Sequence, residues 1–219
     1  MNGLIKPVVH VVDDDEALRD SLRWLLESAG HSVATYATAE GFLATYDPEQ
    51  SGCLVLDIRM PGMSGLELQD ELKRRSHTIP IIFITGHGDV PMAVSAVKKG
   101  AIEFIEKPFN DQAFLILVDN ALALDAELRR AAARLLTLTQ REREVMERVV
   151  AGKRNKDIAT ELSVNIKTVE AHRARLMQKM GVDSRAELVK SKILKVSLWI
   201  TRNLNCRLCP CSRLRNNGG

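Results

Sequence analysis

The stretch Cys53–Gly62 has the sequence CLVLDIRMPG and decides the fold. An apolar run that ends in a carboxylate and is then broken by Pro and Gly is typical of a buried parallel strand. The pattern predicts that this strand delivers Asp57 to the C-terminal edge of a sheet. In open α/β sheets that edge carries the ligand site and the chemistry.

Two other apolar runs also end in polar residues. The run 8–12 is followed by three successive acids, Asp13, Asp14 and Asp15, and the run 79–84 is followed by Thr85. If these strands are parallel neighbours, three carboxylates converge on one rim. Clustered carboxylates stay ionised together only when a cation neutralises them, which for oxygen ligands points to Mg²⁺. A metal-bound Asp57 would then be a nucleophile for phosphoryl transfer.

Strand and helix patterns alternate through the first half of the chain. Apolar runs predict strands at 8–12, 32–37, 53–57, 79–85 and 102–106, and helical spacing predicts helices near 18–29, 39–46, 66–75, 90–99 and from 111 onward. Five strands alternating with five helices predict an α/β fold with a doubly wound, five-stranded parallel sheet. The last helical pattern continues to Leu136 without Pro or Gly, which favours a helical linker.

The second half is helical and basic. Residues 1–125 hold 10 Lys and Arg against 19 Asp and Glu, a balance of −9, whereas residues 126–219 hold 21 against 9, a balance of +12. A capping box at Thr139–Glu142 predicts a helix to Gly152, and further helices are expected at 155–162, 166–180 and from 184. A basic domain with a helix, a short turn and a second helix is a helix-turn-helix candidate.

Length and charge asymmetry favour two domains. We expect a domain at 1–123, a helical linker at 124–136, a helix-turn-helix domain at 137–196 and an atypical, disordered tail at 197–219. No segment has the length and apolar character of a signal peptide or membrane span, because acids arrive at Asp13, so a cytoplasmic protein is expected.

The first half resembles the receiver domain of two-component response regulators, with a flavodoxin-like fold. The residues that carry the resemblance are Asp13 and Asp14, Asp57, the turn Met60-Pro61-Gly62, Thr85, and Lys107 followed by Pro108. Five such features in order at strand ends form a specific pattern.

The second half resembles the LuxR-type helix-turn-helix, so the whole is similar to response regulators of the FixJ type within the NarL and LuxR class. The matching residues are Leu138, Thr139, Arg141, Glu142, Val145, Asn155, Lys156, Ile158, Ala159, Thr168, Val169, His172, Lys179, Met180, Gly181 and Val182.

The resemblance implies roles at the receiver site. Asp14 and Asp57 would bind Mg²⁺ directly, Asp13 would act through water, and the backbone carbonyl of Arg59 would add a ligand. Asp57 would accept a phosphoryl group from a sensor histidine kinase. Lys107 and Thr85 would each bind a phosphoryl oxygen, so the domain would catalyse only its own phosphorylation and dephosphorylation and is otherwise not an enzyme.

The phosphoryl group would also act as a switch. Thr85 would move inward and leave space that Phe104 occupies, which would reshape the face formed by the fourth helix and fifth strand. Receivers of this type dimerise through that face, so a homodimer on phosphorylation is expected. That face includes Val90, Met92, Val94, Val97 and Lys98. RNA polymerase and double-stranded DNA are the other expected partners.

Helical spacing divides the third helix of the second domain into two faces. One face, with Val169, Leu176 and Met180, is expected to pack inward, and the opposite face to enter the major groove. Glu170 would accept from a cytosine amino group, and Ala171 or Ala174 would touch a thymine methyl. His172 would support packing or a phosphate. The phosphate contacts expected are Lys156, Lys167, Thr168, Arg173, Arg175 and Lys179.

Simpler interpretations stay open for several of these features. The acids at 13–15 would serve equally as a solvated helix cap, Phe104 as a core aromatic, and His87 as a rim residue without special chemistry. Two other functions are considered: a Mg²⁺-dependent phosphatase with an aspartyl-phosphate intermediate, and a phospho-scaffold that does not bind DNA. The phosphatase is disfavoured because such enzymes carry an acid two residues after the nucleophile, where this chain has Arg59.

The tail from Ser197 departs from the family pattern. It contains Cys206, Cys209 and Cys211, but a closed zinc site needs four ligands and no His is near. A disordered appendage or a frame-altered end is the interpretation we prefer.

Overall fold

A computed structural model describes residues 6–86 and 103–190 of the chain. The predicted helix at 90–99, the dimer face, His87 and the cysteine-containing tail therefore lie outside the described residues. The chain divides into two compact units, Met1–Ala126 and Glu127–Gly219.

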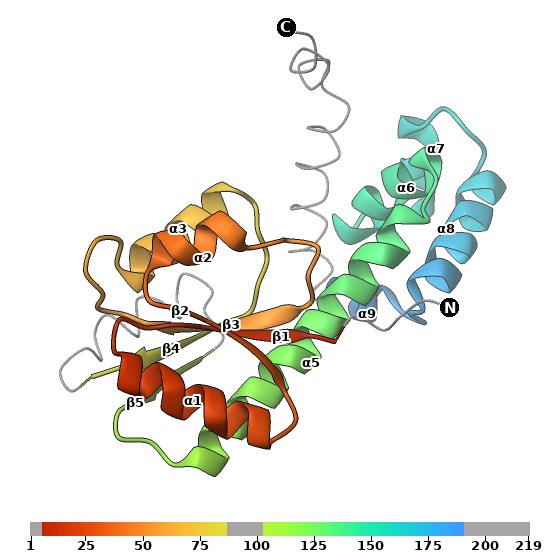
Figure 1. Cartoon of the computed structure of the whole chain (residues 1–219). Coiled ribbons are helices and arrows are strands. Elements are labelled where there is room, and N and C mark those ends of the chain that lie inside the picture. The colour runs from red at the N-terminus through yellow and green to blue at the C-terminus, as the bar shows by residue number, and fades with distance from the viewer. Residues whose placement is uncertain (1–5, 87–102, 191–219) are drawn as a thin grey trace, which may run out of the picture. The chain divides into compact units, whose positions relative to one another are not determined.

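The first unit is built on a five-stranded parallel sheet (Figure 1). Its strands are β1 (Val8–Val12), β2 (Ser32–Tyr36), β3 (Gly52–Asp57), β4 (Ile81–Thr85) and β5 (Glu103–Glu106), in the order β2-β1-β3-β4-β5. The order reverses between β1 and β3, which is where a doubly wound sheet opens a crevice at its C-terminal edge. The doubly wound parallel sheet predicted from the sequence is confirmed.

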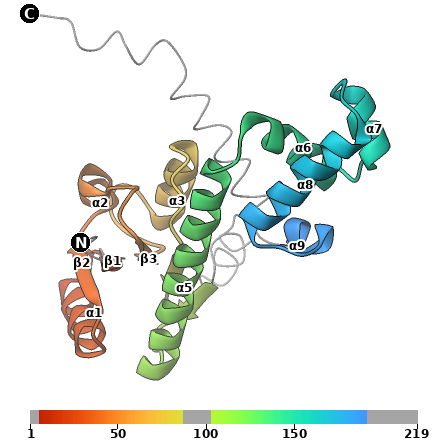
Figure 2. The ribbon, with the colours of Figure 1, turned by 90° about the vertical axis from the view of Figure 1, so that its right-hand side faces the viewer.

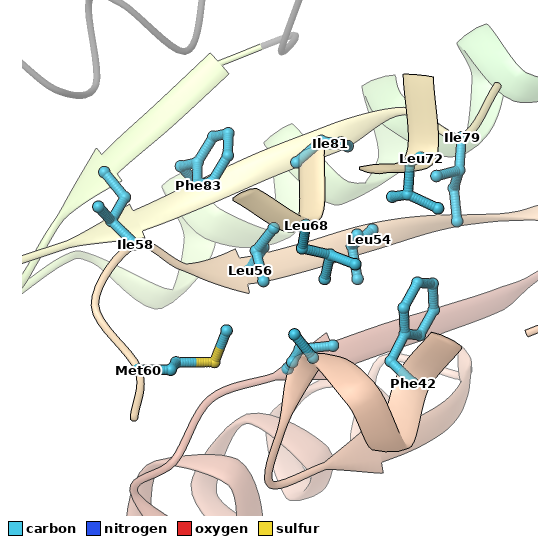
Figure 3. Packing of buried hydrophobic residues seen from close by; sticks show 12 residues of the cluster. Phe42, Leu54, Leu56, Ile58, Met60, Leu68, Leu72, Ile79, Ile81 and Phe83 are labelled. Carbon is cyan, nitrogen blue, oxygen red and sulfur yellow. The ribbon is translucent and has the colours of Figure 1, made fainter. Parts of the chain in front are cut away.

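Alternate residues of each central strand face opposite layers, as the period of a strand requires. On one face Leu54, Leu56 and Phe83 pack against helices α2 (Ala39–Thr45) and α3 (Gly65–Arg74), as Figure 3 shows. On the other face Val55 and Ile84 pack against α1 (Glu16–Ser28) and α5 (Asp111–Leu136). Covering both faces explains why these strands are apolar throughout.

Several boundaries differ from the predicted ones by one or two residues. The fourth strand begins at Ile81 and not at residue 79, because Pro80 has no N–H to give to the ladder. The helix expected at 39–46 ends at Thr45, and Tyr46 caps it in an extended conformation. The final helix of this unit begins at the expected Asp111, but its cap is the neighbouring Asn110, whose side chain accepts from the Ala113 N–H at 3.0 Å.

Helix α5 is unbroken to Leu136 (Figure 2), as its sequence pattern predicted. Its last residues belong to the core of the second unit: Leu128, Leu135 and the adjoining Leu138 pack in that cluster. The remaining helices are α6 (Gln140–Val150), α7 (Asn155–Glu161), α8 (Ile166–Met180) and α9 (Arg185–Lys190). Helices α6 and α7 end one or two residues before the predicted positions, at residues that adopt cap geometry.

Candidate functional site

Asp57 is the last residue of β3 and is only 7% exposed. Its strand lies between β1 and β4, so Asp13, which directly follows β1, and Thr85, which ends β4, come to the same edge. Lys107 directly follows β5, and its backbone N–H donates to the Thr85 carbonyl at 2.8 Å. The parallel sheet thus brings together four residues that are far apart in the sequence.

The Lys107 ammonium links the two buried carboxylates. Its Nζ lies 2.9 Å from Asp57 Oδ1 and 3.1 Å from Asp13 Oδ2. Burial alone would lower the pKa of Lys107, but the bonds from Asp57 and the charge of Asp13 outweigh it and raise the pKa, so the ammonium stays charged. Burial raises the pKa of Asp57, and the Lys107 bond opposes that shift. The site therefore holds negative charge that needs cationic compensation.

Backbone contacts fix the position of the Asp57 side chain. The N–H of Arg59 donates to Asp57 Oδ2 at 2.7 Å. Gly65 packs so closely that a Cβ at this position would lie 2.1 Å from the Asp57 carbonyl oxygen, and its N–H donates to Ile58 at 3.0 Å. Gly65 was not among the residues predicted for the site, although its place directly after the Ser64 helix cap was a signal that the backbone turns there.

A second missed residue is Arg19 on α1. Its Nη1 donates to the backbone carbonyl of Asp13 at 2.7 Å, and the Asp13 carboxylate accepts from the Asp15 N–H at 2.9 Å. These contacts hold the loop after β1. No motif in the sequence indicated this role for Arg19.

Lys107 joins two of the carboxylates expected at this edge, those of Asp13 and Asp57. Asp13 is 1% exposed and Asp57 is 7% exposed, whereas the adjoining Asp14 is exposed to solvent. In residues 6–86 and 103–190, no three His, Cys, Asp or Glu side chains have the spacing of a metal site. Carboxylates together with a backbone carbonyl suit Mg²⁺, which takes few protein oxygens and keeps its waters.

Thr85 and Phe104, the two residues expected to switch, differ in their surroundings. Thr85 is fully buried, and its Oγ1 has no hydrogen-bond partner in the described part of the chain. A buried hydroxyl without a partner is uncommon and calls for an explanation, and an incoming acceptor oxygen would supply one. Phe104 is half-buried, packs against the α2–α3 side of the core and lies opposite Phe83 in the sheet register.

In the second unit, α8 presents the two faces that its sequence predicted. Val169, Leu176 and Met180 are fully buried. The opposite face is exposed over Lys167, Glu170, Ala171, Ala174 and Gln178. Asn165 caps the start of α8, and its side chain accepts from both the N–H and the hydroxyl of Thr168.

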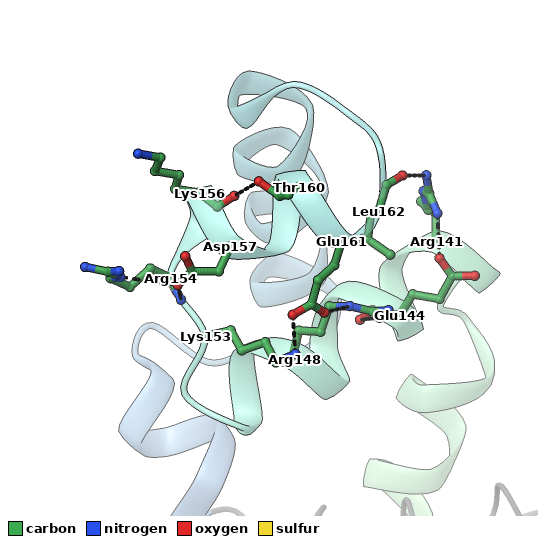
Figure 4. Close-up of polar contacts among 10 residues, drawn as sticks. All are labelled: Arg141, Glu144, Arg148, Lys153, Arg154, Lys156, Asp157, Thr160, Glu161 and Leu162. Atoms are coloured by element: carbon green, nitrogen blue, oxygen red, sulfur yellow. Dashed lines mark hydrogen bonds and ion pairs between the residues drawn. The ribbon is translucent and has the colours of Figure 1, made fainter.

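Many cations around α6 and α7 are neutralised by local acids (Figure 4). Glu161 binds both Arg148, at 3.0 Å, and Lys153, and Asp157 binds Arg154 at 3.2 Å. Figure 4 shows the Lys156 ammonium pointing away from these pairs, and only its backbone carbonyl is engaged there, by Thr160.

The expected phosphate contacts fall into two groups. Among the residues that the structure covers, no ion pair includes Lys156, Lys167 or Arg175. Arg173 instead donates to Asn155 at 3.0 Å, and Lys179 donates to Glu142 at 2.7 Å. His172 is half-buried, and its Nδ1 is buried without a hydrogen-bond partner in the described residues.

Two family models match the chain. The response regulator receiver domain matches residues 9–119, and the bacterial regulatory proteins of the luxR family match residues 136–191. Both matches coincide with the units built around Asp57 and α8. No helix within residues 6–86 and 103–190 is long and apolar enough to cross a membrane.

Known proteins are similar to this chain over most of its length. The transcriptional regulatory protein FixJ of Azorhizobium caulinodans is 47% identical over 193 residues, which are 85% of this chain and 92% of FixJ. The C4-dicarboxylate transport transcriptional regulatory protein DctR of Rhodobacter capsulatus is 44% identical over 191 residues, 83% of this chain and 97% of DctR.

Solved structures agree with these relatives. The response regulator StyR is 49% identical, with a TM-score of 0.56 over 87% of this chain and 98% of StyR. Full-length FixJ from B. japonicum is 41% identical, with a TM-score of 0.53 over 88% of this chain and 98% of that one. The chain therefore belongs to the family of two-component response regulators that combine a receiver domain with a LuxR-type helix-turn-helix domain.

Proposed function

We propose that Asp57 accepts a phosphoryl group from a sensor histidine kinase and that this modification controls how α8 engages DNA. Membership of the family makes the chain a transcriptional response regulator, and its receiver family generally binds Mg²⁺ at an acidic pocket. The observation that supports the site assignment is the Lys107 ammonium, 2.9 Å from Asp57, beside a buried Thr85 hydroxyl that lacks a partner in the described residues.

The residues divide the work of phosphoryl transfer. An Asp57 oxygen attacks phosphorus, the P–N bond of a phosphohistidine breaks, and the released imidazole takes up a proton. Lys107 binds a phosphoryl oxygen and offsets its charge, and Thr85 donates its hydroxyl to another. Because the groups are already in place, positioning supplies most of the catalysis.

Asp13, Asp14, Asp57 and the Arg59 carbonyl are the residues we propose for Mg²⁺. When bound, Mg²⁺ would neutralise charge on the carboxylates and on the phosphoryl oxygens. Asp14 is the exposed carboxylate among the three. Calorimetric titration with MgCl₂ should therefore show weaker binding for Asp14→Asn, and equal binding by Asp14→Asn and wild type would remove Asp14 from the set.

The test of the phosphoacceptor uses acetyl phosphate and Mg²⁺ with the full chain. Wild type should gain one phosphoryl mass, and Asp57→Asn should gain none. Asp20→Asn is the control, because this carboxylate is 62% exposed on α1. Equal labelling of Asp57→Asn and wild type would contradict the assignment.

For DNA we propose that Lys156, Lys167, Thr168 and Arg175 contact phosphates, while Glu170, Ala171 and Ala174 face base edges. The exposure of Glu170, Ala171 and Ala174 supports this division, as does the absence of ion pairs at the three cations in the described residues. We assign to the positioning of α8 the half-buried His172 and Arg173, the latter through its bond to Asn155.

We also propose domain limits, a cellular location and partners for the chain. We place the receiver at 1–123, the linker at 124–136 and the DNA-binding domain at 137–196, in a cytoplasmic protein that also contacts RNA polymerase. We expect phosphorylation to produce a homodimer. The only reactions that we propose for the receiver are its own phosphorylation and dephosphorylation. Light scattering with and without acetyl phosphate tests the dimer, and an unchanged mass would contradict it.

A further inference from the structure

The C-terminal end of α8 is held by cationic side chains that bond backbone carbonyls. Arg134, near the end of α5, donates from Nη1 to the carbonyl of Met180 at 2.9 Å. Lys179 donates to the carbonyl of Thr137 at 3.1 Å and to the carboxylate of Glu142 at 2.7 Å. The last turn of α8 is thus tied to the end of α5 and to the start of α6.

Arg134 meets the carbonyl that the helix itself leaves open. Gly181 ends α8 with φ +64°, and its N–H and that of Val182 return to carbonyls of the last turn. The Met180 carbonyl is instead satisfied by Arg134, and a cation also suits the negative end of a helix. The guanidinium lies so close that a Cβ at Gly181 would be 3.0 Å from Nη1.

Lys179, whose side chain is 34% exposed, is paired with the buried carboxylate of Glu142. The Glu142 side chain is 3% exposed and also accepts from the Thr139 N–H at 2.8 Å. Burial alone would raise the pKa of Glu142, but the bonds from Lys179 and Thr139 outweigh it and lower the pKa. Loss of the ion pair would leave a buried charge on Glu142 without compensation, so we expect Lys179 to stay bound to Glu142.

Apolar packing joins the same three segments. Leu135 and Leu138 are buried in one cluster with Val145 of α6 and with Leu176 and Met180 of α8. The end of the linker helix is therefore part of the body that carries α8.

We propose that Lys179 and Arg134 are positioning residues that fix the orientation of α8 for base reading, and that Lys179 does not contact a DNA phosphate. The proposal rests on the DNA-binding function proposed above. On this proposal the C-terminal end of α5, which is part of the linker, influences the orientation of α8, because Arg134 donates to the Met180 carbonyl of α8.

The two possible roles of Lys179 predict different salt dependence. Loss of a phosphate contact lowers affinity for every sequence and reduces the slope of log Kd against log salt by about one. Loss of a positioning residue leaves the slope unchanged and reduces preference for the specific site, because base contacts need precise placement whereas phosphate contacts tolerate small rotations.

The experiment measures Kd against salt for two duplexes of about 30 base pairs, long enough for a dimer with two half-sites. One is the duplex that wild type enriches from a randomised pool, and the other is its scrambled version. Lys179→Met should lower the ratio of the two affinities about tenfold or more without changing either slope. Lys167→Ala is the matched control, which should reduce both slopes by about one.

Two further variants keep the test decisive if Lys179→Met unfolds. Arg134→Gln should lower the same ratio, and Arg134→Lys, which keeps a cation beside the Met180 carbonyl, should restore part of it. Thermal unfolding confirms that each variant is folded at the assay temperature.

The outcomes separate the proposals. A slope reduced by about one in Lys179→Met makes this residue a phosphate contact and overturns the inference. An unchanged affinity ratio in both Lys179→Met and Arg134→Gln overturns it as well. If wild type enriches no duplex and shows no salt-dependent binding, the DNA-binding function itself fails, which is a different result.

Discussion

Ser51 and Asp125 are joined by a hydrogen bond of 2.6 Å between the serine hydroxyl and the carboxylate, although 74 residues separate them in the sequence. The same carboxylate accepts from the backbone N–H of Gly52 at 3.0 Å, and it is 1% exposed. Asp125 therefore fastens α5 to the N-terminal end of the strand that carries Asp57.

Replacing Asp125 with Ala should destabilise the receiver by about 2 kcal/mol, because it leaves a buried N–H and hydroxyl without their acceptor. Native-state hydrogen exchange of the β3 amides measures this within the first unit. Asn120→Ala, an exposed change on the same helix, is the control and should alter exchange little. Equal protection in the two variants would show that the buried carboxylate contributes nothing.

Gly65→Ala should impair phosphorylation without altering any side chain of the site. The added Cβ would lie 2.1 Å from the Asp57 carbonyl oxygen and 3.0 Å from Leu56 Cγ, so the end of β3 must move. We expect a loss of about 3 kcal/mol in stability and slower labelling by acetyl phosphate. Gly41→Ala serves for comparison, since its Cβ would meet only the Thr38 hydroxyl oxygen at 3.3 Å. Normal labelling of Gly65→Ala would argue that the backbone of Asp57 tolerates displacement.

Thr85→Val should separate folding from signalling. The Thr85 hydroxyl is buried without a partner in the described residues, so its removal should leave the unphosphorylated receiver unchanged or up to about 1 kcal/mol more stable. Asp57 should still be labelled, whereas the gain in DNA affinity on phosphorylation should fall. Urea unfolding and DNA titration with and without acetyl phosphate provide the two readouts. A full gain in the variant would exclude Thr85 from the switch.

Acidification should destabilise the receiver through His10. Its ring is 5% exposed, with Nδ1 3.2 Å from the Tyr36 hydroxyl, and burial lowers its pKa to about 4. Between about pH 6.5 and about pH 4 only the unfolded chain binds this proton, so stability falls as pH falls through that window, by about 3 kcal/mol in all. Below it, His10 adds no further loss.

The variant His10→Gln should flatten that pH dependence of unfolding in urea. Burial also lowers the pKa of His77, so His77→Gln should remove part of the remaining slope. His31→Gln is the comparison, because His31 faces the largely exposed Asp119. The same slope in His10→Gln and wild type would mean that His10 is protonated in the folded state.

Lys167→Ala and Glu170→Gln should affect DNA binding in different ways. Both side chains are exposed on α8. Lys167→Ala should weaken binding to all duplexes and reduce the slope of log Kd against log salt by about one. Glu170→Gln should change the binding free energy by about 1–3 kcal/mol between bases at one position, and so change the preferred base there. Enrichment from a randomised pool, followed by salt titration, measures both. A Glu170→Gln protein that enriches the wild-type sequence would place α8 differently on DNA.

Local patterns in the sequence were enough for the order and type of the elements. Apolar runs and helical spacing predicted the five strands and the unbroken α5, because both depend on which side of each element is buried. The capping box at Thr139 and Glu142 also predicted the start of α6 correctly. Strand ends then indicated which residues share the functional edge, since parallel strands present their C-terminal ends together.

The tertiary structure decided which side chains bind one another. Lys107 meets Asp57 and Asp13 across 50 and 94 residues, and only the packed sheet fixes that meeting. The structure also pairs Lys179 with the buried carboxylate of Glu142, a contact that no local pattern in the sequence indicated. Periodicity reports burial along one element, whereas the partner of a charged side chain depends on neighbours from distant elements.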